Sequence, residues 1–344
     1  MTHEQFEIFS NQAVAACALL YFMVFLAQLA AWVSGRVGAG MSAEVPASTS
    51  PEQPAVASGS GTVGSPGSVA LAAPAGTGGN EDRSDLFARV GLALTVVAAS
   101  VHFAALVSRG LASDPVRVPW GNMYEFTLTA TFVVVALYLL MYRRFELAWL
   151  APVISLFVLT VLMIDVLVLY EPVTPLRDAL QSPWLVIHVV AAILATGAFT
   201  MGGMCSVLYL VKERSLRRGG AQRGYLASVP PLKSLDRLAY RWHAFAFPVW
   251  TFAALIAGPI WANYAWGRYW GWDPKEVWAF ITWVVYAGYL HARATAGWKG
   301  NRAAVVALVG LATLWFNFVG INFFFGSGSQ HSYALELVTR TLGG

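Results

Sequence analysis

Long, continuous apolar runs follow one another along most of the chain. Each holds about 20 residues, which at 1.5 Å per residue is enough for a helix to cross a hydrocarbon core of about 30 Å. The runs lack the alternation of apolar and polar positions that marks the strands of a membrane β-barrel. The pattern therefore predicts an all-α, polytopic integral membrane protein with about eight spans, at 11–33, 85–107, 123–142, 147–169, 184–211, 243–262, 277–293 and 303–325.

Composition and charge support this interpretation and orient the spans. Only 12% of the residues are charged and 57% are hydrophobic, whereas about 25% charged residues are usual in soluble domains. Of the 22 Lys and Arg residues, 16 fall on one side of the predicted topology, which the positive-inside rule assigns to the cytoplasm. We therefore expect a multi-pass protein of the plasma membrane with both termini and the loop between spans six and seven outside. Membrane orientation accounts for the excess of basic residues, so it does not indicate nucleic-acid binding.

Three segments are expected. Residues 1–36 hold an N-terminal transmembrane helix, which no Lys or Arg precedes as it would in a signal peptide. Residues 37–84 are rich in Ala, Gly, Ser and Pro and predict a disordered cytoplasmic linker. Residues 85–344 form the main transmembrane domain. The 2 cysteines lie in separate apolar runs without a CxxC pair, so we expect them to pack rather than to perform thiol chemistry.

The loop at 261–278 is unusually aromatic, with five of the chain's 14 tryptophans. Scattered tryptophans at the headgroup level are an ordinary feature of membrane proteins. Here two glycines, Gly267 and Gly271, are interleaved with them and permit close approach of the backbone. The indoles therefore predict a platform for a large, flat, apolar ligand, with Asp273-Pro274 ending the loop and starting the next helix.

The sequence Trp266-Gly-Arg-Tyr-Trp270-Gly-Trp272-Asp273 matches the W-G-x-x-W-x-W-D signature of the haem-handling WWD superfamily. Its surroundings resemble the CcsA branch, also called ResC, which is the integral membrane half of the System II cytochrome c synthase. The resemblance covers roughly residues 85 to 340. Further matching segments are Pro119–Glu125, Ser182–His188, and Phe318–Phe325 followed by His331.

The predicted topology also sorts the histidines. His188, one turn into span five, and His331, just beyond span eight, flank the tryptophan loop on the same side of the membrane. A single histidine near a helix end is usually a packing residue, but two that converge on an aromatic platform suit the axial positions of haem iron. The resemblance implies that both are external haem ligands and act in catalysis. His291, near the cytoplasmic end of span seven, either caps that helix beside Arg293 or, as the resemblance implies, holds haem on the inner side.

The resemblance implies a function in cytochrome c biogenesis. The chain would move haem b to the outer face and present it, ligated by histidine, for thioether attachment to the CxxCH segment of apocytochrome c. It would be one component of a holocytochrome c synthase, with a CcsB/ResB/Ccs1-type membrane partner and a thioredoxin-like thiol reductant. The implied cofactor-binding residues are His188, His331, His291, Trp266, Gly267, Trp270, Trp272 and Asp273, with iron bound by the three histidines.

Two other functions remain open: a b-type dihaem electron carrier, and a haem exporter without synthase activity. The electron carrier would need histidine pairs at two depths, and only one inner histidine is well placed.

Arg109, Arg117 and Arg268 are candidates for pairing with haem propionates, and the sequence does not choose among them. We expect His102 to pack within its span and His243 to lie at the membrane interface, where span six begins. For Asp165 and Glu125, we favour a role in buried hydrogen bonding over a role in proton relay.

Overall fold

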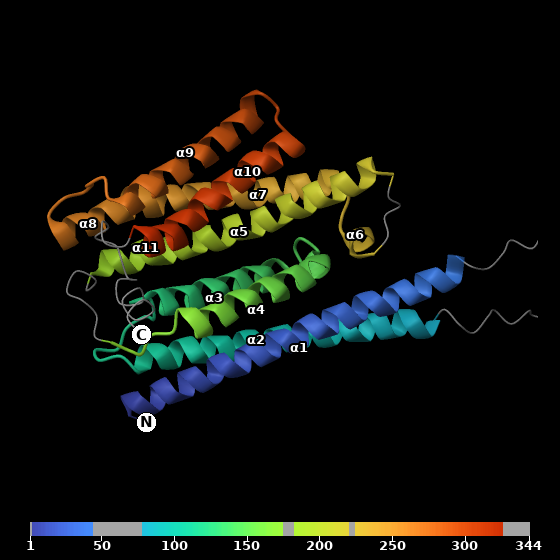
Figure 1. Cartoon of the computed structure of the whole chain (residues 1–344), viewed down its shortest axis with the longest axis horizontal. Helices are drawn as coiled ribbons and strands as arrows, with labels where there is room; N and C mark the ends of the chain where they lie inside the picture. The colour runs from blue at the N-terminus through green and yellow to red at the C-terminus, as the bar shows by residue number, and fades with distance from the viewer. Residues whose placement is uncertain (1, 44–77, 175–181, 220–223, 326–344) are drawn as a thin grey trace, which may run out of the picture.

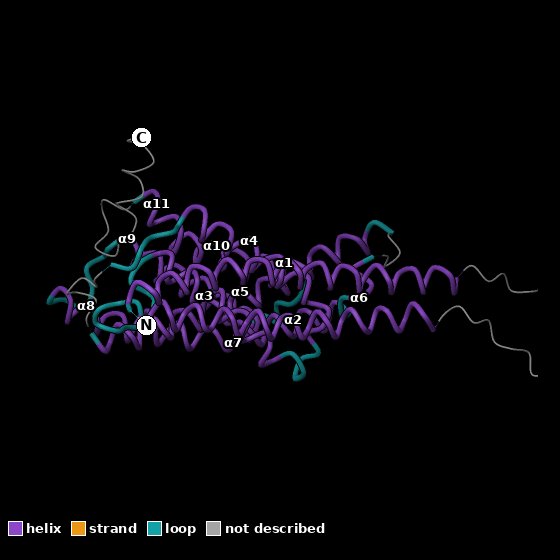
Figure 2. Tube along the Cα trace, turned by 90° about the horizontal axis from the view of Figure 1, so that it is seen from below, coloured by secondary structure: helices purple, strands orange, loops and turns teal. Residues whose placement is uncertain are grey.

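The computed structural model describes residues 2–43, 78–174, 182–219 and 224–325. The regular structure of these residues is helical, and the long helices run side by side in one elongated bundle, as Figure 1 and, turned by 90°, Figure 2 show. In chain order the elements are α1 (His3–Ala43), α2 (Gly78–Leu111), α3 (Met123–Met141), η1 (Leu147–Leu150), α4 (Ala151–Val168), α5 (Pro183–Arg217), α6 (Tyr225–Ser228), α7 (Leu232–Thr251), η3 (Phe252–Ala257), α8 (Gly258–Trp266), α9 (Pro274–Thr295), α10 (Asn301–Trp315), η4 (Phe316–Gly320) and α11 (Ile321–Phe324).

Each expected span corresponds to a helix or a run of joined helices. Among the described residues, 7 such stretches are long and apolar enough to cross a membrane. The remaining expected span, 277–293, lies within α9, which has 22 residues. Helix α9 is not among these 7 stretches, yet it packs along α7 and α10 within the bundle. The prediction of an all-α polytopic membrane fold is confirmed.

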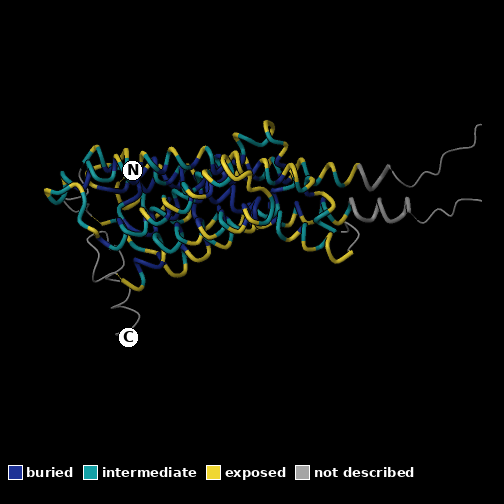
Figure 3. Tube along the Cα trace, turned by 90° about the horizontal axis from the view of Figure 1, so that it is seen from above, coloured by how far each residue is buried: buried dark blue, intermediate teal, exposed yellow. Residues whose placement is uncertain are grey.

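Successive long helices run in opposite directions. The connection between α8 and α9, residues 267–273, lies at the same end of the bundle as the start of α1 and the end of α11 (Figure 1). We call this the loop end. Figure 3 shows buried residues along the middle of the bundle and exposed residues on its outside. Large apolar side chains such as Leu140 (70% exposed) and Leu167 (73% exposed) point outward, as expected where hydrocarbon is the solvent.

Helical structure enters the expected 37–84 linker from both sides. Helix α1 continues through Ala43, and α2 begins at Gly78. Residues 44–77, which make up most of the expected linker, lie outside the described residues. The two helices pack along each other, so this N-terminal pair forms one side of the bundle.

A buried cluster of charged groups fixes the loop end of α2 and α3. Arg109 Nε donates to Glu125 Oε1 at 3.1 Å, and Arg117 Nη1 donates to Glu125 Oε2 at 2.6 Å. The backbone N–H of Gly121 donates to the same Oε2 at 2.8 Å. Because Arg109 and Glu125 are fully buried, the cluster holds the segment before α3 in place. Two of the three arginines considered for propionate pairing are thus engaged by Glu125.

Two histidines of the bundle are packed side chains. His102 is fully buried and hydrogen-bonds through Nε2 to the carbonyl of Leu128 at 3.0 Å, in agreement with its expected packing role. The interfacial position expected for His243 is wrong: its ring is fully buried, with its centroid 5.2 Å from that of Tyr289. The reason is that α7 begins at Leu232, well before the apolar run, so position 243 already lies inside the bundle.

Candidate functional site

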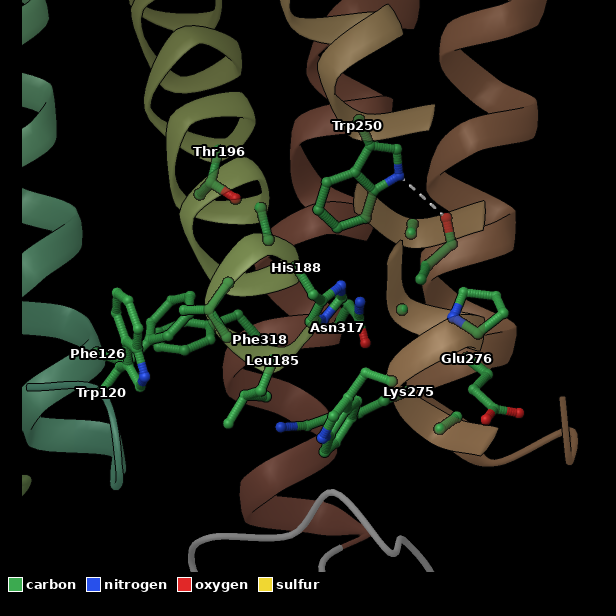
Figure 4. A pocket seen from close by; sticks show the side chains of 18 of the residues that line it. Trp120, Phe126, Leu185, His188, Thr196, Trp250, Lys275, Glu276, Asn317 and Phe318 are labelled. Carbon is green, nitrogen blue, oxygen red and sulfur yellow. Dashed lines mark hydrogen bonds between the residues drawn. The ribbon is translucent and has the colours of Figure 1, made fainter. Parts of the chain in front are cut away.

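A cavity lies at the loop end, between α3, α5, α8, α9 and the end of α10 (Figure 4). It encloses about 1160 Å³ of space not filled by protein atoms, part of it open to solvent. Its walls are mainly apolar and aromatic, and the polar and charged residues that line it are Asn122, His188, Thr196, Lys275, Glu276 and Asn317.

His188 is held in this wall in a defined orientation. Helix α5 begins one and a half turns earlier, where Ser182 Oγ accepts from the Trp184 N–H and Pro183 occupies the first turn. The His188 Nδ1–H donates to the carbonyl of Ala253 at 2.9 Å, and the ring stacks on Trp261 with centroids 5.9 Å apart and planes 11° apart. A carbonyl acceptor at Nδ1 puts the ring's lone pair on Nε2, which is the arrangement of a metal-binding histidine.

The Ala253 carbonyl comes from a π-helical segment. Residues Phe252–Ala257 interrupt the helix between α7 and α8, and the Gly258 N–H bonds to Ala253 O instead of to a carbonyl four residues earlier. A Cβ at Gly258 would lie 3.1 Å from both Ala253 O and His188 Nδ1, so the glycine permits the ring to approach. A second π-helical segment, Phe316–Gly320, brings Asn317 to the cavity. Such segments occur frequently at functional sites.

The loop between α8 and α9 is shaped by Gly267 and Asp273. Gly267 ends α8 with a φ of 71° and donates its N–H to Asn263 O at 2.9 Å, a conformation that favours glycine. Asp273 Oδ1 accepts from the Lys275 N–H at 2.9 Å, and Glu276 Oε2 accepts from the Asp273 N–H at 3.1 Å. This capping box starts α9, so both residues serve the shape of the loop.

The tryptophans of the loop do not form one continuous surface. Trp270 and Trp261 line the cavity. Trp266 packs behind Trp261, with ring centroids 4.8 Å apart. Trp272 meets the edge of Trp270 with centroids 6.0 Å apart, but its side chain is 71% exposed and does not line the cavity. The described indoles therefore form a cavity wall, a layer behind it and an exposed rim.

Two polar groups of the cavity were not assigned a role from the sequence. Lys275, in the first turn of α9 before the expected span, extends into the cavity (Figure 4). Burial lowers the pKa of Lys275 to about 7, against the opposing effect of the Asp273 carboxylate. The Oδ1 atom of Asn317 is buried and has no hydrogen-bond partner among the described residues, as expected of a group that a ligand or water would satisfy.

The structure brings His188 and Trp270 together at one cavity. The other expected site residues that it describes do not line that cavity, namely Trp266, Gly267, Trp272, Asp273 and His291. His291 is exposed on α9 toward the opposite end, and its neighbour Arg293 instead pairs with Asp236 at 2.8 Å. His331 lies outside the described residues. The sequence contained a signal for part of the missed wall, since Gly258-Pro259 interrupts an apolar run.

Comparison with known proteins gives consistent matches. The family model described as cytochrome C assembly protein matches residues 120–327. Cytochrome c biogenesis protein CcsA of Guillardia theta is 34% identical over 262 residues, covering 71% of this chain and 85% of that protein. CcsA of Synechococcus sp. (strain JA-2-3B'a(2-13)) is 32% identical over 305 residues, covering 72% and 86%. A solved structure of cytochrome c haem lyase CcmF superposes with a TM-score of 0.54 at 16% identity, covering 99% of this chain and 52% of that one, so the two share a fold.

Proposed function

This chain belongs to the CcsA (ResC) family of cytochrome c assembly proteins, and from that premise we propose that its loop-end cavity holds haem b with His188 as an axial ligand. The observation that carries the proposal is the orientation of His188. Its Nδ1–H is fixed on the Ala253 carbonyl at 2.9 Å, so Nε2 carries the lone pair. This nitrogen belongs to a side chain that lines a mainly apolar and aromatic cavity, part of it open to solvent, and such walls suit a flat apolar macrocycle.

The proposed chemistry divides between the protein and the haem. The protein excludes water from the macrocycle with Trp250, Trp261 and Trp270 and fixes its position through the iron, with His331 proposed as the second axial ligand. In the attachment step, each thiol S–H of the apocytochrome CxxCH segment adds across a haem vinyl group. Sulfur forms the thioether bond and the hydrogen goes to the other vinyl carbon. The chain's contribution is to hold the vinyl groups where the thiols arrive.

We assign the export step and the partners by the same reasoning. We propose that His291, which is exposed on α9 away from the cavity, holds an inner haem together with a second ligand from a CcsB/ResB/Ccs1-type membrane partner. The 2 cysteines are both buried, so a separate thioredoxin-like reductant would keep the apocytochrome thiols reduced. We place the protein in the plasma membrane with the loop end extracytoplasmic.

The test is co-expression of the chain and its partner with a CxxCH reporter, scored for covalent haem and for haem that copurifies with the chain. His188→Ala should abolish the covalent product, whereas His3→Ala, an exposed histidine at the same end, should not. Normal reporter maturation in His188→Ala would reject the ligand assignment. Haem that copurifies without any covalent product from the wild-type chain would favour the b-type electron carrier, and reporter maturation independent of iron ligation would favour the exporter.

A further inference from the structure

The cavity that contains His188 has one cationic wall residue. Among its described lining residues, Lys275 is the one lysine or arginine, and the surrounding wall is formed largely by Trp120, Leu185, Trp270 and other apolar side chains. Figure 4 shows Lys275 reaching from the start of α9 toward the side of the cavity where Leu185 lies. A compact ammonium in such a wall provides a point charge for an anion that would otherwise be buried against apolar atoms.

The arginines of the loop end are placed elsewhere. Arg109 and Arg117 pair with the buried Glu125, and neither lines the cavity. Arg268 lies across Gly271, because a Cβ on that glycine would fall 0.8 Å from Arg268 Nη1, and it does not line the cavity either. None of the three arginines considered for propionate pairing therefore provides a positive charge at this wall.

Lys275 places a positive charge at the start of a helix. It follows Asp273 and Pro274 in the first turn of α9, where the positive end of the helix dipole disfavours another positive charge. The neighbouring Glu276 carboxylate is directed toward the loop backbone, since its Oε2 accepts from the N–H groups of Gly271 at 2.8 Å and Asp273 at 3.1 Å. The Asp273 carboxylate favours the charged form of Lys275, and a ligand carboxylate at the cavity end of the side chain would add a charge-assisted hydrogen bond there.

We propose that Lys275 binds a carboxylate of the substrate, namely a propionate of the haem held in this cavity. This inference rests on the proposed function, and it adds the group that orients the macrocycle. His188 would fix the iron while Lys275 fixes one carboxylate-bearing edge, so the two contacts together define which edge carries the vinyl groups toward the incoming thiols. Lys275 is then a positioning residue that distinguishes porphyrins with free propionates from those without.

The test uses the purified full-length chain in detergent, titrated with haem and with haem dimethyl ester, in which both propionates are capped. The wild-type chain should bind haem about tenfold more tightly than the ester, as expected for loss of one charge-assisted contact of about 1.4 kcal/mol. Lys275→Met, which keeps the length of the side chain, should lose this preference by weakening haem alone. Lys275→Arg should retain it, and Lys233→Met, an exposed lysine far from the cavity, should leave both affinities unchanged.

The two ligands separate this proposal from the one on which it rests. His188→Ala should weaken haem and ester equally, because the iron is common to both. If Lys275→Met weakens both ligands equally, or neither, the carboxylate assignment is overturned while the His188 result still stands. If the wild-type chain binds neither ligand, or His188→Ala binds both as tightly as wild type, the proposed function fails as well. Thermal unfolding midpoints of all variants establish that each is folded.

Discussion

Gly258→Ala tests whether the backbone behind His188 determines haem binding. The added methyl group would lie 3.1 Å from both Ala253 O and His188 Nδ1, closer than carbon usually approaches either atom. The carbonyl belongs to the π-helical segment and moves only with the backbone, so we expect the imidazole to shift by a few tenths of an ångström. The hydrogen bond of 2.9 Å that orients the ring would lengthen or bend as a result.

The expected effect follows from the role of that hydrogen bond. Disturbing the partner of a metal-binding histidine typically lowers metal affinity by about 10- to 100-fold, which corresponds to about 1.4–2.8 kcal/mol. We therefore expect haem affinity of Gly258→Ala to fall by about tenfold or more. The visible spectrum of the bound haem should change as well, because the ligand field at the iron depends on the orientation of the imidazole.

The assay is a spectroscopic haem titration of purified wild type and variants. Gly288→Ala is the matched control: this glycine lies within α9, and apart from its chain neighbours and the backbone of its own helix no described heavy atom lies within 4 Å of its added Cβ. That control should bind haem normally and gain a little stability, since alanine favours a helix interior by about 0.5–1 kcal/mol. Wild-type affinity together with an unchanged spectrum in Gly258→Ala would refute the inference that the Ala253 carbonyl orients His188.

Two further predictions concern the wall and the frame of the cavity. Trp270→Ala should reduce haem that copurifies with the chain without reducing the amount of chain in the membrane, and equal haem content would show that Trp270 does not contact the macrocycle. Glu125→Ala should lower the thermal unfolding midpoint in detergent by an amount equivalent to about 3 kcal/mol, because it removes the fully buried carboxylate 3.1 Å from Arg109 and leaves that arginine with the longer contact of 3.6 Å to Glu7. Arg217→Ala, which removes the 73% exposed partner of Glu213, should leave the midpoint nearly unchanged, and an equal loss in both variants would contradict this reasoning.

The sequence was sufficient to predict the transmembrane helices, since long apolar runs are the strongest pattern that a membrane imposes. The matches to CcsA proteins confirm the resemblance that the Trp266–Asp273 signature indicated. The error at His243 arose because α7 starts at Leu232, in a polar stretch that the apolar run does not include. Apolar periodicity marks where a helix meets hydrocarbon, and the helix itself continues into the polar region beyond.

The candidate site was harder to anticipate, because its wall is assembled from residues between positions 120 and 318. The motif marks Trp270, which lines the cavity, and its role at a ligand site stays a prediction. A single platform was too simple, since Trp272 is 71% exposed. Lys275 and Asn317 carried no local signal for a ligand. Lys275 has the sequence context of an ordinary first turn, and only the packing of α9 against the other helices directs it into the cavity.

Each of the two π-helical segments changes the face of the helix on which the residues after it lie. One additional residue in a turn advances everything that follows by about 100° around the axis. A helical wheel drawn straight through Phe252–Ala257 thus assigns the inward and outward sides correctly on one side of that segment and rotates them on the other. This offset sets the direction in which Trp261 points, which is toward His188. Counting in steps of three and four residues from α7 therefore does not place Trp261 on the correct face.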